Sequence, residues 1–580
     1  MKRIALREVA HARSGEKGRG SNIAVIAYDE ADYPILRDQL GVAAVSRLYG
    51  PITKGAITRY EAPRIGALNF VLEDVLEGGR TRTLAFEESG KALSSLMLTL
   101  PVDVPDDYVE RSKRRRETIP VAPMPRAAGK RIRLGSAAAW SRDRMEPAEA
   151  LVRHGHVDYL CFDAMSEITM SMAQTERMAN PAIPPYDPML PARMEPLLRI
   201  CKERGVKIVT NAGWLDPVAA ADRILQIARR LGMSDLKVGA VCGGLLTDRI
   251  AALGLAFTET GEPIANYRER IVSAEAYLGA GGIVEALAKG ADVVVTARVA
   301  DACVYLGPLA HEFGWSLDDP ELMAKGMVVG HLLECGAQVC GGYFADPGYK
   351  EVPGLEDLGN PIAEVSEDRI ILTKLDGTGG VMSPATCKEQ LLYEVQDPSR
   401  YFCPDVVVDF TNVSFKQLAK DQVEVIIDHA GSPRTSSLKA LVGLQEGFMT
   451  EEMVLFAGPG ALARAELTKE LLLKRFEKID LRAEELRFDY IGLNAVHRES
   501  SPAPAAEPYE VVLRIALKTA DRAEAEKLRR EVDPLAVNGA SGTGKWATSA
   551  PGSRVRPVIG LNSTLVPREL VPVTVVMRAL

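Results

Sequence analysis

The stretch VKIVTNAGWLDPVAAADRILQIARRLGMSDLKVGAV, residues 206–241, decides the fold class. It begins with the short apolar run VKIVTN (206–211) and ends with a second one, LKVGAV (236–241), and runs of this length are typical of buried strands. Between them, DPVAAADRILQIARRLG (216–232) has apolar residues at helical spacing. A strand, a helix and another strand at this spacing predict a parallel sheet that is covered by helices.

The same alternation extends over residues 131–360. Further strands are predicted at RIRLGS (131–136), VDYLCFD (157–163) and ADVVVTA (291–297). Further helices are predicted at PAEALVRH (147–154), PARMEPLLRICKER (191–204) and GGIVEALAKG (281–290). The sequence therefore predicts an α/β fold with a doubly wound, mostly parallel sheet and helices on both of its faces.

Two other units flank this lobe. Residues 1–105 combine strand-like runs with helical spacing and predict a small α+β domain. Proline and charge, including the basic run RSKRRR (111–116), dominate residues 106–130, which predicts a solvated linker. Longer strand-like runs after residue 361, with helices at 461–478 and 521–532, predict a second α+β lobe that extends to residue 580.

Composition narrows the class of protein. The 580 residues carry 70 basic and 78 acidic side chains, a net charge of −8, so no nucleic acid partner is expected. No apolar run is long enough to cross a membrane, and we expect a soluble, cytoplasmic protein without a membrane partner. The 8 cysteines form no CxxC motif, which predicts buried, reduced thiols. A homo-oligomer is expected because large catabolic enzymes commonly form symmetric assemblies.

Polar and small residues follow five of the predicted strands. In open parallel sheets, ligands bind beyond the carboxyl ends of the strands. We therefore expect a pocket there for a small molecule, lined by the residues that follow the strands: Ser136, Asp163, Glu167, Asn211, Gly213, Gly243, Gly244, Arg298 and Asp301. Of these, Ser136, Asn211, Gly213, Gly243, Gly244 and Arg298 are predicted to bind substrate.

Two pairs of charged residues in this set suggest roles in catalysis or in ligand binding. If their segment is helical, Asp163 and Glu167 share one face and could bind a cation or act as acid and base. The alternative is a helix cap followed by a solvent-facing glutamate. Arg298 could hold a substrate carboxylate while Asp301 orients the guanidinium, or the two could form only a local ion pair.

The stretch GHLLECGAQVCGG (330–342) brings His331, Glu334 and Cys335 to one face of a helix that is predicted to end at Gly341-Gly342. A metal site is one interpretation, but no companion motif supplies further ligands, and no metal or organic cofactor is predicted. A thiol beside an imidazole could instead form an activated nucleophile or an acid–base pair. The simplest interpretation is a buried polar helix face near a contact.

Two glycine-rich loops could bind anions. Backbone amides of Gly377, Thr378, Gly379 and Gly380 lie ahead of Ser383 and Pro384, which suit the N-cap and first position of a helix. They could cradle a carboxylate, a phosphate or the pyrophosphate of an acyl-CoA. The loop RSGEKGRGSN (13–22) joins two predicted strands, so a hairpin turn is favoured, although Arg13, Lys17 and Arg19 leave an anion site open.

Many separated segments resemble one family in its own order. They include RIRLGSAAAW, HVDYLCFDAMSEITMS, VTNAGWLDPVAAA, GHLLECGAQVCGGYFAD and DGTGGVMSPATCKEQLLYEV, and the resemblance, to the acyclic terpene utilisation AtuA family, covers residues 131–580. Residues 1–105, with AHARSGEKGRGSNIAV and LNFVLEDVL, are similar to the small ferredoxin-like domain that accompanies this family. The resemblance implies catabolic chemistry on carboxylic acids or acyl-CoA, and it assigns no residue roles.

These observations lead to two hypotheses. The first is a catabolic enzyme of the hydratase or hydro-lyase type, acting on a hydroxy or unsaturated carboxylic acid or its acyl-CoA thioester, with acid–base residues drawn from Asp163, Glu167, Asp301, His331, Glu334 and Cys335. The second is a noncatalytic subunit that binds an acyl-CoA or a partner enzyme through the N-terminal domain. No GxSxG, HExxH or helix-opening GxGxxG motif supports other enzyme classes.

Overall fold

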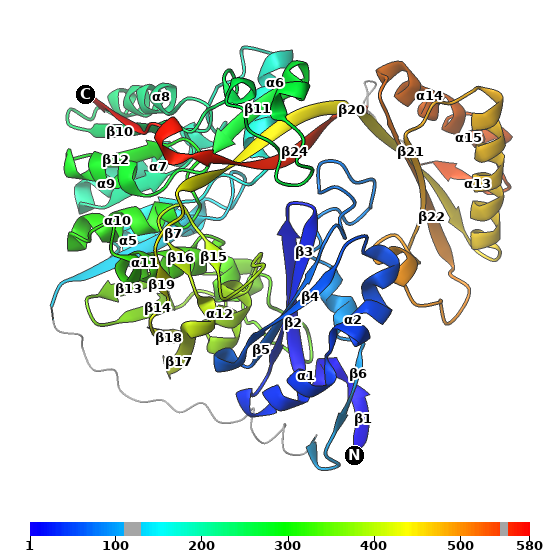
Figure 1. Ribbon diagram of the computed structural model, residues 1–580, viewed down its shortest axis with the longest axis horizontal. Coiled ribbons are helices and arrows are strands. Elements are labelled where there is room, and N and C mark those ends of the chain that lie inside the picture. Colours follow the sequence, from blue (N-terminus) through cyan, green and yellow to red (C-terminus); the bar gives the residue numbers. More distant parts are fainter. Residues whose placement is uncertain (109–128, 546–554) are drawn as a thin grey trace.

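A computed structural model describes residues 1–108, 129–545 and 555–580 of the chain (Figure 1). Most of the predicted linker, including the run RSKRRR, lies outside the described residues. In the described part, no helix combines the length and the apolar character needed to cross a membrane.

A ten-stranded mixed sheet forms the centre of the structure. The predicted strands of the first lobe are confirmed, and they lie side by side and parallel in the order β7, β8, β9, β12, β10. Their bounds are Arg131–Ala138, Tyr159–Phe162, Lys207–Thr210, Val293–Thr296 and Lys237–Cys242. Because they are parallel, their carboxyl ends share one edge of the sheet.

The sheet is less parallel than predicted. Antiparallel strands extend it on one side through β13, β14, β18 and β17, and on the other through β25. Their bounds are Pro361–Ser366, Ile370–Lys374, Gln422–Ile427, Val413–Ala419 and Thr574–Ala579. The boundary predicted at residue 360 therefore falls inside this sheet, because an apolar run does not specify which strand it will pair with.

Helices cover both faces of the parallel strands. Side chains alternate along each strand, so Leu160 and Phe162 join one core cluster while Tyr159 and Cys161 join the other. The first cluster packs against α5, α7 and α8, and the second packs against α9, α10 and α11. These helices are Glu146–His154, Leu190–Arg204, Pro217–Arg230, Gly281–Ala288, Cys303–Phe313 and Pro320–Leu333. The remaining helices of this part are α6 (Thr169–Ala179) and α12 (Pro384–Leu391).

A second sheet is built on the 21-residue strand β20 (Ser437–Ala457). It pairs antiparallel with β11, β22, β23 and β24, and β21 pairs with β22 (Ile271–Ala276, Glu510–Thr519, Gly544–Lys545, Arg556–Pro567, Glu485–Ile491). The predicted helices are confirmed as α13 (Ala461–Lys478) and α14 (Arg522–Val532). Figure 1 shows β20 running from the central part to the unit that contains these two helices. Short elements complete this half: α15 (Leu535–Asn538) and the small sheet of β15, β16 and β19 (Tyr401–Phe402, Val407–Val408, Gly431–Ser432).

The N-terminal domain has a four-stranded antiparallel sheet in the order β2, β3, β5, β4 (Ala10–Lys17, Gly20–Ala27, Ala67–Leu72, Ile57–Ala62). The helices α1, α2 and α3 (Tyr33–Gln39, Val42–Tyr49, Leu93–Met97) pack with it around a core of its own, and β1 pairs with β6 (Lys2–Ala5, Pro101–Val104). Lys17 pairs with Gly20 across a tight turn, which confirms the hairpin predicted for the loop of residues 13–22.

Candidate functional site

Asp163 and Asn211 meet at the carboxyl ends of the neighbouring strands β8 and β9. The Nδ2 amide of Asn211 donates a hydrogen bond of 2.7 Å to Oδ1 of Asp163, and its Oδ1 accepts one of 2.7 Å from the backbone amide of Ala164. Both side chains are buried. The predicted convergence of these two residues is confirmed, and the amide fixes the position of the carboxyl.

The surroundings of Asp163 favour the neutral form of its carboxyl. Burial raises its pKa well above the usual range, and the negative charges of Asp301 and Glu334 raise it further. The hydrogen bond from Asn211 and the charge of Arg298 oppose this effect without outweighing it. These interactions bring residues from the ends of three strands and from α11 into one group, which we call the acid cluster: Asp163, Asn211, Arg298, Asp301, His331 and Glu334.

Arg298 is a buried cation with unused hydrogen-bonding capacity. Arg298 comes shortly after β12 in the chain. Its side chain is 3% exposed, and its Cζ lies 4.1 Å from the centre of the Tyr277 ring. Its Nη1 is 2.9 Å from Oδ1 of Asp301, so the two form the ion pair that was one of the predicted alternatives. Alignment at this contact is poor, and Nε and Nη1 of Arg298 and Oδ1 of Asp301 make no hydrogen bond within the described residues.

The charge of Arg298 is nevertheless secure. Burial disfavours it, but Asp301, Tyr277 and Asp163 together raise the pKa of the guanidinium above its ordinary value. A permanently charged, planar donor with free nitrogen atoms is well suited to binding a carboxylate or a developing oxyanion.

His331, which is buried, and Glu334, whose side chain is 13% exposed, form a second pair at the end of α11. Nε2 of His331 donates to the carbonyl of Leu391 at 3.1 Å, so Nδ1 is the atom that faces Oε1 of Glu334 at 3.0 Å. Burial raises the pKa of Glu334, while His331 lowers it. If neither atom carried a proton, the lone pairs on Nδ1 of His331 and Oε1 of Glu334 would repel each other at 3.0 Å. One proton therefore lies between the imidazole and the carboxyl.

Cys335 does not share this arrangement. Helix α11 ends at Leu333 rather than at the predicted Gly341-Gly342, because Gly336 takes a left-handed conformation with φ of 56° and starts a separate turn. Burial raises the pKa of the Cys335 thiol well above its usual value, and the charge of Glu334 adds to this. A raised pKa favours the protonated thiol, which argues against an activated nucleophile, and a catalytic role for Cys335 stays a prediction.

Glu167 is likewise separated from Asp163. Residues 163–168 are not helical, because α6 begins only at Thr169, so the predicted shared face does not form. Glu167 accepts a hydrogen bond of 2.9 Å from Nζ of Lys439. Burial opposes its ionisation, but Lys439 and Lys17 lower its pKa to about 2. Glu167 is an ionised partner of lysine and is unsuited to donating a proton.

Four of the predicted substrate-binding residues have structural roles. Ser136 is buried and accepts a hydrogen bond of 2.8 Å from the hydroxyl of Tyr305. A Cβ at Gly213 would lie 2.6 Å from the carbonyl oxygen of Thr296, and one at Gly243 would lie 2.5 Å from that of Pro572. A Cβ at Gly244 would lie 2.8 Å from the carbonyl oxygen of Ala276. These glycines allow neighbouring backbones to approach, and contact with a ligand stays a prediction.

The loop of residues 377–380 does not provide an anion cradle. The amides of Gly379 and Gly380 donate to the carbonyls of Asp357 and Pro353, both at 2.7 Å, and the amide of Thr378 faces the carbonyl of Leu375. Ser383 caps α12 and Pro384 opens it, as predicted, but the capping box also satisfies the start of that helix. The prediction is wrong because packing against residues 353–359 uses the amides that an anion would need.

Several residues near the acid cluster were missed. Glu275 lies on β11, its Oε2 has no hydrogen-bond partner among the described residues, and burial raises its pKa to about 8. The hydroxyl of Tyr277 is also buried beside Arg298. Ser273, Glu275 and Tyr277 alternate along the chain, and this spacing of polar residues could have marked one face of a strand. Tyr401, whose ring lies 5.2 Å from that of His331, carried no such signal.

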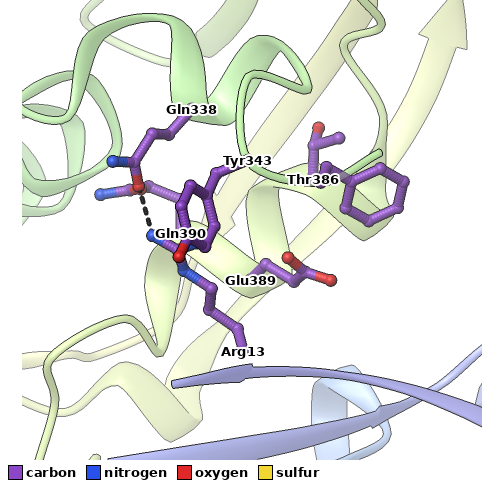
Figure 2. A pocket seen from close by; sticks show the side chains of 7 residues that line it. Arg13, Gln338, Tyr343, Thr386, Glu389 and Gln390 are labelled. Carbon is purple, nitrogen blue, oxygen red and sulfur yellow. Dashed lines mark hydrogen bonds between the residues drawn. The ribbon is translucent and has the colours of Figure 1, made fainter. Parts of the chain in front are cut away.

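A narrow pocket, with room for about one water molecule, lies where the N-terminal domain meets α12. Figure 2 shows Arg13 reaching Gln338 across it, beside Tyr343. None of the predicted site residues lines this pocket. Among the described residues, no group of three or more His, Cys, Asp or Glu side chains could hold a metal ion.

The model of the acyclic terpene utilisation family protein AtuA matches residues 132–577. The chain belongs to the AtuA family. The model of the AtuA ferredoxin-like domain matches residues 4–103, so the resemblance found in the sequence is confirmed for both parts. No curated protein and no solved structure matches the chain. Membership of the AtuA family implies a catabolic role in acyclic terpene utilisation.

Proposed function

We propose that this AtuA family member is a hydro-lyase that adds water to, or removes it from, a carboxylic acid or its acyl-CoA thioester. The observation that carries the proposal is a group of buried polar atoms that have no hydrogen bond to any described residue: Nε and Nη1 of Arg298 and Oδ1 of Asp301. Buried polar atoms are almost always paired, so a bound ligand is the best explanation for several unpaired atoms in one cluster.

The cluster offers a base and an acid for dehydration. In the proposed reaction, the Asp301 carboxylate removes a proton from the carbon beside the carbonyl group, and the electrons of that C–H bond form the carbon–carbon double bond. The C–O bond at the next carbon breaks, and its oxygen takes the proton held by the His331–Glu334 pair and leaves as water. Exchange with solvent returns the proton from Asp301 to the pair, and hydration is the same sequence in reverse.

Arg298 and Asp163 would stabilise the charge that develops during this reaction. Removal of the proton places negative charge on the carbonyl oxygen of the substrate. A guanidinium and a neutral carboxyl group can both donate hydrogen bonds to that oxygen, and such donors are most effective in a buried site. The raised pKa of Asp163 supports this role, because only the protonated carboxyl has a hydrogen to donate.

Incorporation of oxygen from labelled water tests the proposal. The protein is incubated in H₂¹⁸O with crotonyl-CoA and with short unsaturated acids, and products are analysed by mass spectrometry. Wild type is expected to form labelled hydroxy products, and Arg298→Met to lose at least about 100-fold in rate. The matched control is Arg229→Met, which alters an exposed arginine on α8. Binding of these compounds without turnover would instead favour a noncatalytic acyl-CoA-binding subunit.

A further inference from the structure

The β2–β3 hairpin of the N-terminal domain docks directly beside the acid cluster. Nδ2 of Asn22 donates to the carbonyl of Leu392 at 2.7 Å, and Nδ1 of His11 lies 2.5 Å from Oε1 of Glu389. A Cβ at Gly15 would lie only 2.4 Å from the ring of Tyr393, so glycine permits this close approach. Leu392 directly follows the residue whose carbonyl accepts the hydrogen bond of His331.

Arg13 fixes the hairpin in this position. Its guanidinium lies between the rings of Tyr343 and Tyr393, at 3.8 and 4.1 Å, and its Nη2 donates to Oε1 of Gln338 at 2.6 Å (Figure 2). Stacking on both faces and a charged hydrogen bond hold a buried arginine firmly. The residues that follow Arg13 along β2 are therefore carried to a defined place on the core.

Lys17, at the end of β2, reaches the cluster. Its Nζ lies 5.9 Å from the centre of the Tyr401 ring, and that ring lies 5.2 Å from His331. The positive charge of Lys17 also lowers the pKa of Glu334 and, after Lys439, that of Glu167. The ammonium group therefore acts electrostatically on two acids of the core.

The ammonium group of Lys17 nevertheless has no close polar partner among the described residues. In the part of the chain that the structure describes, its ammonium makes no hydrogen bond and no ion pair, only the long contact with Tyr401. Lys439, another lysine of this region, forms an ion pair with Glu167, with Nζ 2.9 Å from Oε1. Arg298 and Lys17 are therefore two separate cationic groups with free donors, and both act electrostatically on Tyr277.

We propose that Lys17 is a substrate-binding residue of the candidate site and holds a second anionic group of the substrate, away from the carboxyl or thioester group at Arg298. This inference rests on the proposed function for the role of Arg298. The N-terminal domain then completes the site, which requires the two domains to act as one unit. The substrate class is an acid with two anionic ends, and the second end is a distal carboxylate or a phosphate of coenzyme A.

Titration calorimetry on the full-length protein separates these possibilities with three probes: butyrate, glutarate and butyryl-CoA. Lys17→Met is compared with wild type and with Lys91→Met. Lys91 is the matched control because it is also a lysine of the N-terminal domain beside a tyrosine ring, at 6.0 Å from that of Tyr393. Lys17→Met is expected to weaken the binding of glutarate or of butyryl-CoA about 10- to 100-fold and to leave butyrate unchanged. The probe that loses affinity identifies the second anionic group.

Restored affinity in Lys17→Arg would confirm that charge at this position binds the ligand. Equal affinities of wild type and Lys17→Met for all three probes would overturn the inference, and so would an equal loss for butyrate and glutarate. If Lys17→Met does not fold, Lys17→Gln serves in its place. Arg298→Met separates the two proposals, because unchanged butyrate binding in that variant contradicts the proposed function, whatever Lys17 does.

Discussion

Asp163 and Glu167 are close in sequence and have opposite environments. Among the described residues, Asp163 makes no ion pair with a cation, and burial raises its pKa, which favours the neutral carboxyl. Glu167 is held ionised by Lys439 and Lys17, although burial opposes this. Their contributions to stability should therefore depend on pH with opposite signs.

Glu167→Gln should destabilise the protein at neutral pH. Because the pKa of Glu167 is lowered to about 2 in the folded state, its ionised form contributes stability above its ordinary pKa, and this contribution is lost as the pH falls towards 2. We expect a loss in the free energy of unfolding of about 2 kcal/mol at pH 7, which narrows as the pH falls below about 5. Urea unfolding at several pH values measures this difference. Glu149→Gln, at an exposed pair with Arg153, is the control and should change stability little. A pH-independent difference would contradict the ion pair.

Asp163→Asn should show the reverse trend. The folded state raises the pKa of this carboxyl, so its contribution is present below the ordinary pKa and is lost as the pH rises towards the folded value. Asparagine cannot ionise and keeps an oxygen for the hydrogen bond from Asn211. The melting temperature of the variant should therefore rise relative to wild type between pH 5 and pH 9, values chosen to lie above the ordinary pKa of aspartate. An unchanged difference over that range would show that Asp163 is ionised in the fold, because its titration would then be complete below pH 5 in both states.

At the scale of elements, substitutions in the loop of residues 377–380 test whether its glycines are needed for packing or for binding a ligand. A Cβ at Gly379 would lie 1.8 Å from the carbonyl oxygen of Gly354, whereas nothing lies within 4 Å of one at Gly377. Gly379→Ala should cost about 3 kcal/mol or more, and Gly377→Ala, with its φ of 82°, about 1 kcal/mol. Urea unfolding distinguishes them. If Gly377→Ala weakened the binding of an anionic ligand at unchanged stability, the anion cradle would have to be reconsidered.

The elements also show what the sequence can reveal. The strands β7, β8, β9, β10 and β12 were predictable because each is a short apolar run between helical segments, and that pattern is local. Antiparallel additions such as β13 and β25 were not, because pairing depends on partners far along the chain. The end of α11 was missed for a similar reason: the helical spacing continues past Leu333, and only the left-handed Gly336 interrupts it.

At the scale of the whole molecule, Asn69 links the N-terminal domain to the core. Its buried Nδ2 donates to the carbonyls of Val395 and Gln396 at 2.8 and 2.7 Å, and its Oδ1 accepts from Asn22 at 2.8 Å. Asn69→Ala leaves these groups unpaired and should cost about 2–3 kcal/mol. Hydrogen exchange should accelerate in β2, β3 and residues 391–396. The exposed Asn180→Ala is the control, and unchanged exchange in Asn69→Ala would contradict firm docking.

At this scale, the sequence predicts part of the acid cluster but not all of the candidate site. The shared edge of the parallel strands predicted that Asp163, Asn211 and Arg298 would meet, since that follows from the architecture. The contribution of Lys17 could not be derived in this way, because it depends on how two separate domains dock. Basic residues in the loop of residues 13–22 left an anion site open, and the position of that loop is shown only by its contacts with the core, such as that of Arg13 with Tyr393.

Deuterium exchange tests the central claim, that the acid cluster removes a proton beside a carbonyl group. The protein is incubated in D₂O with 3-hydroxybutyrate, butyryl-CoA and crotonyl-CoA, and NMR follows the hydrogens on the carbon next to the carbonyl. Wild type is expected to introduce deuterium there, while Asp301→Asn is expected to lose at least about 100-fold in exchange rate. A compound that binds in an Arg298-dependent manner and yet exchanges no hydrogen would contradict the account.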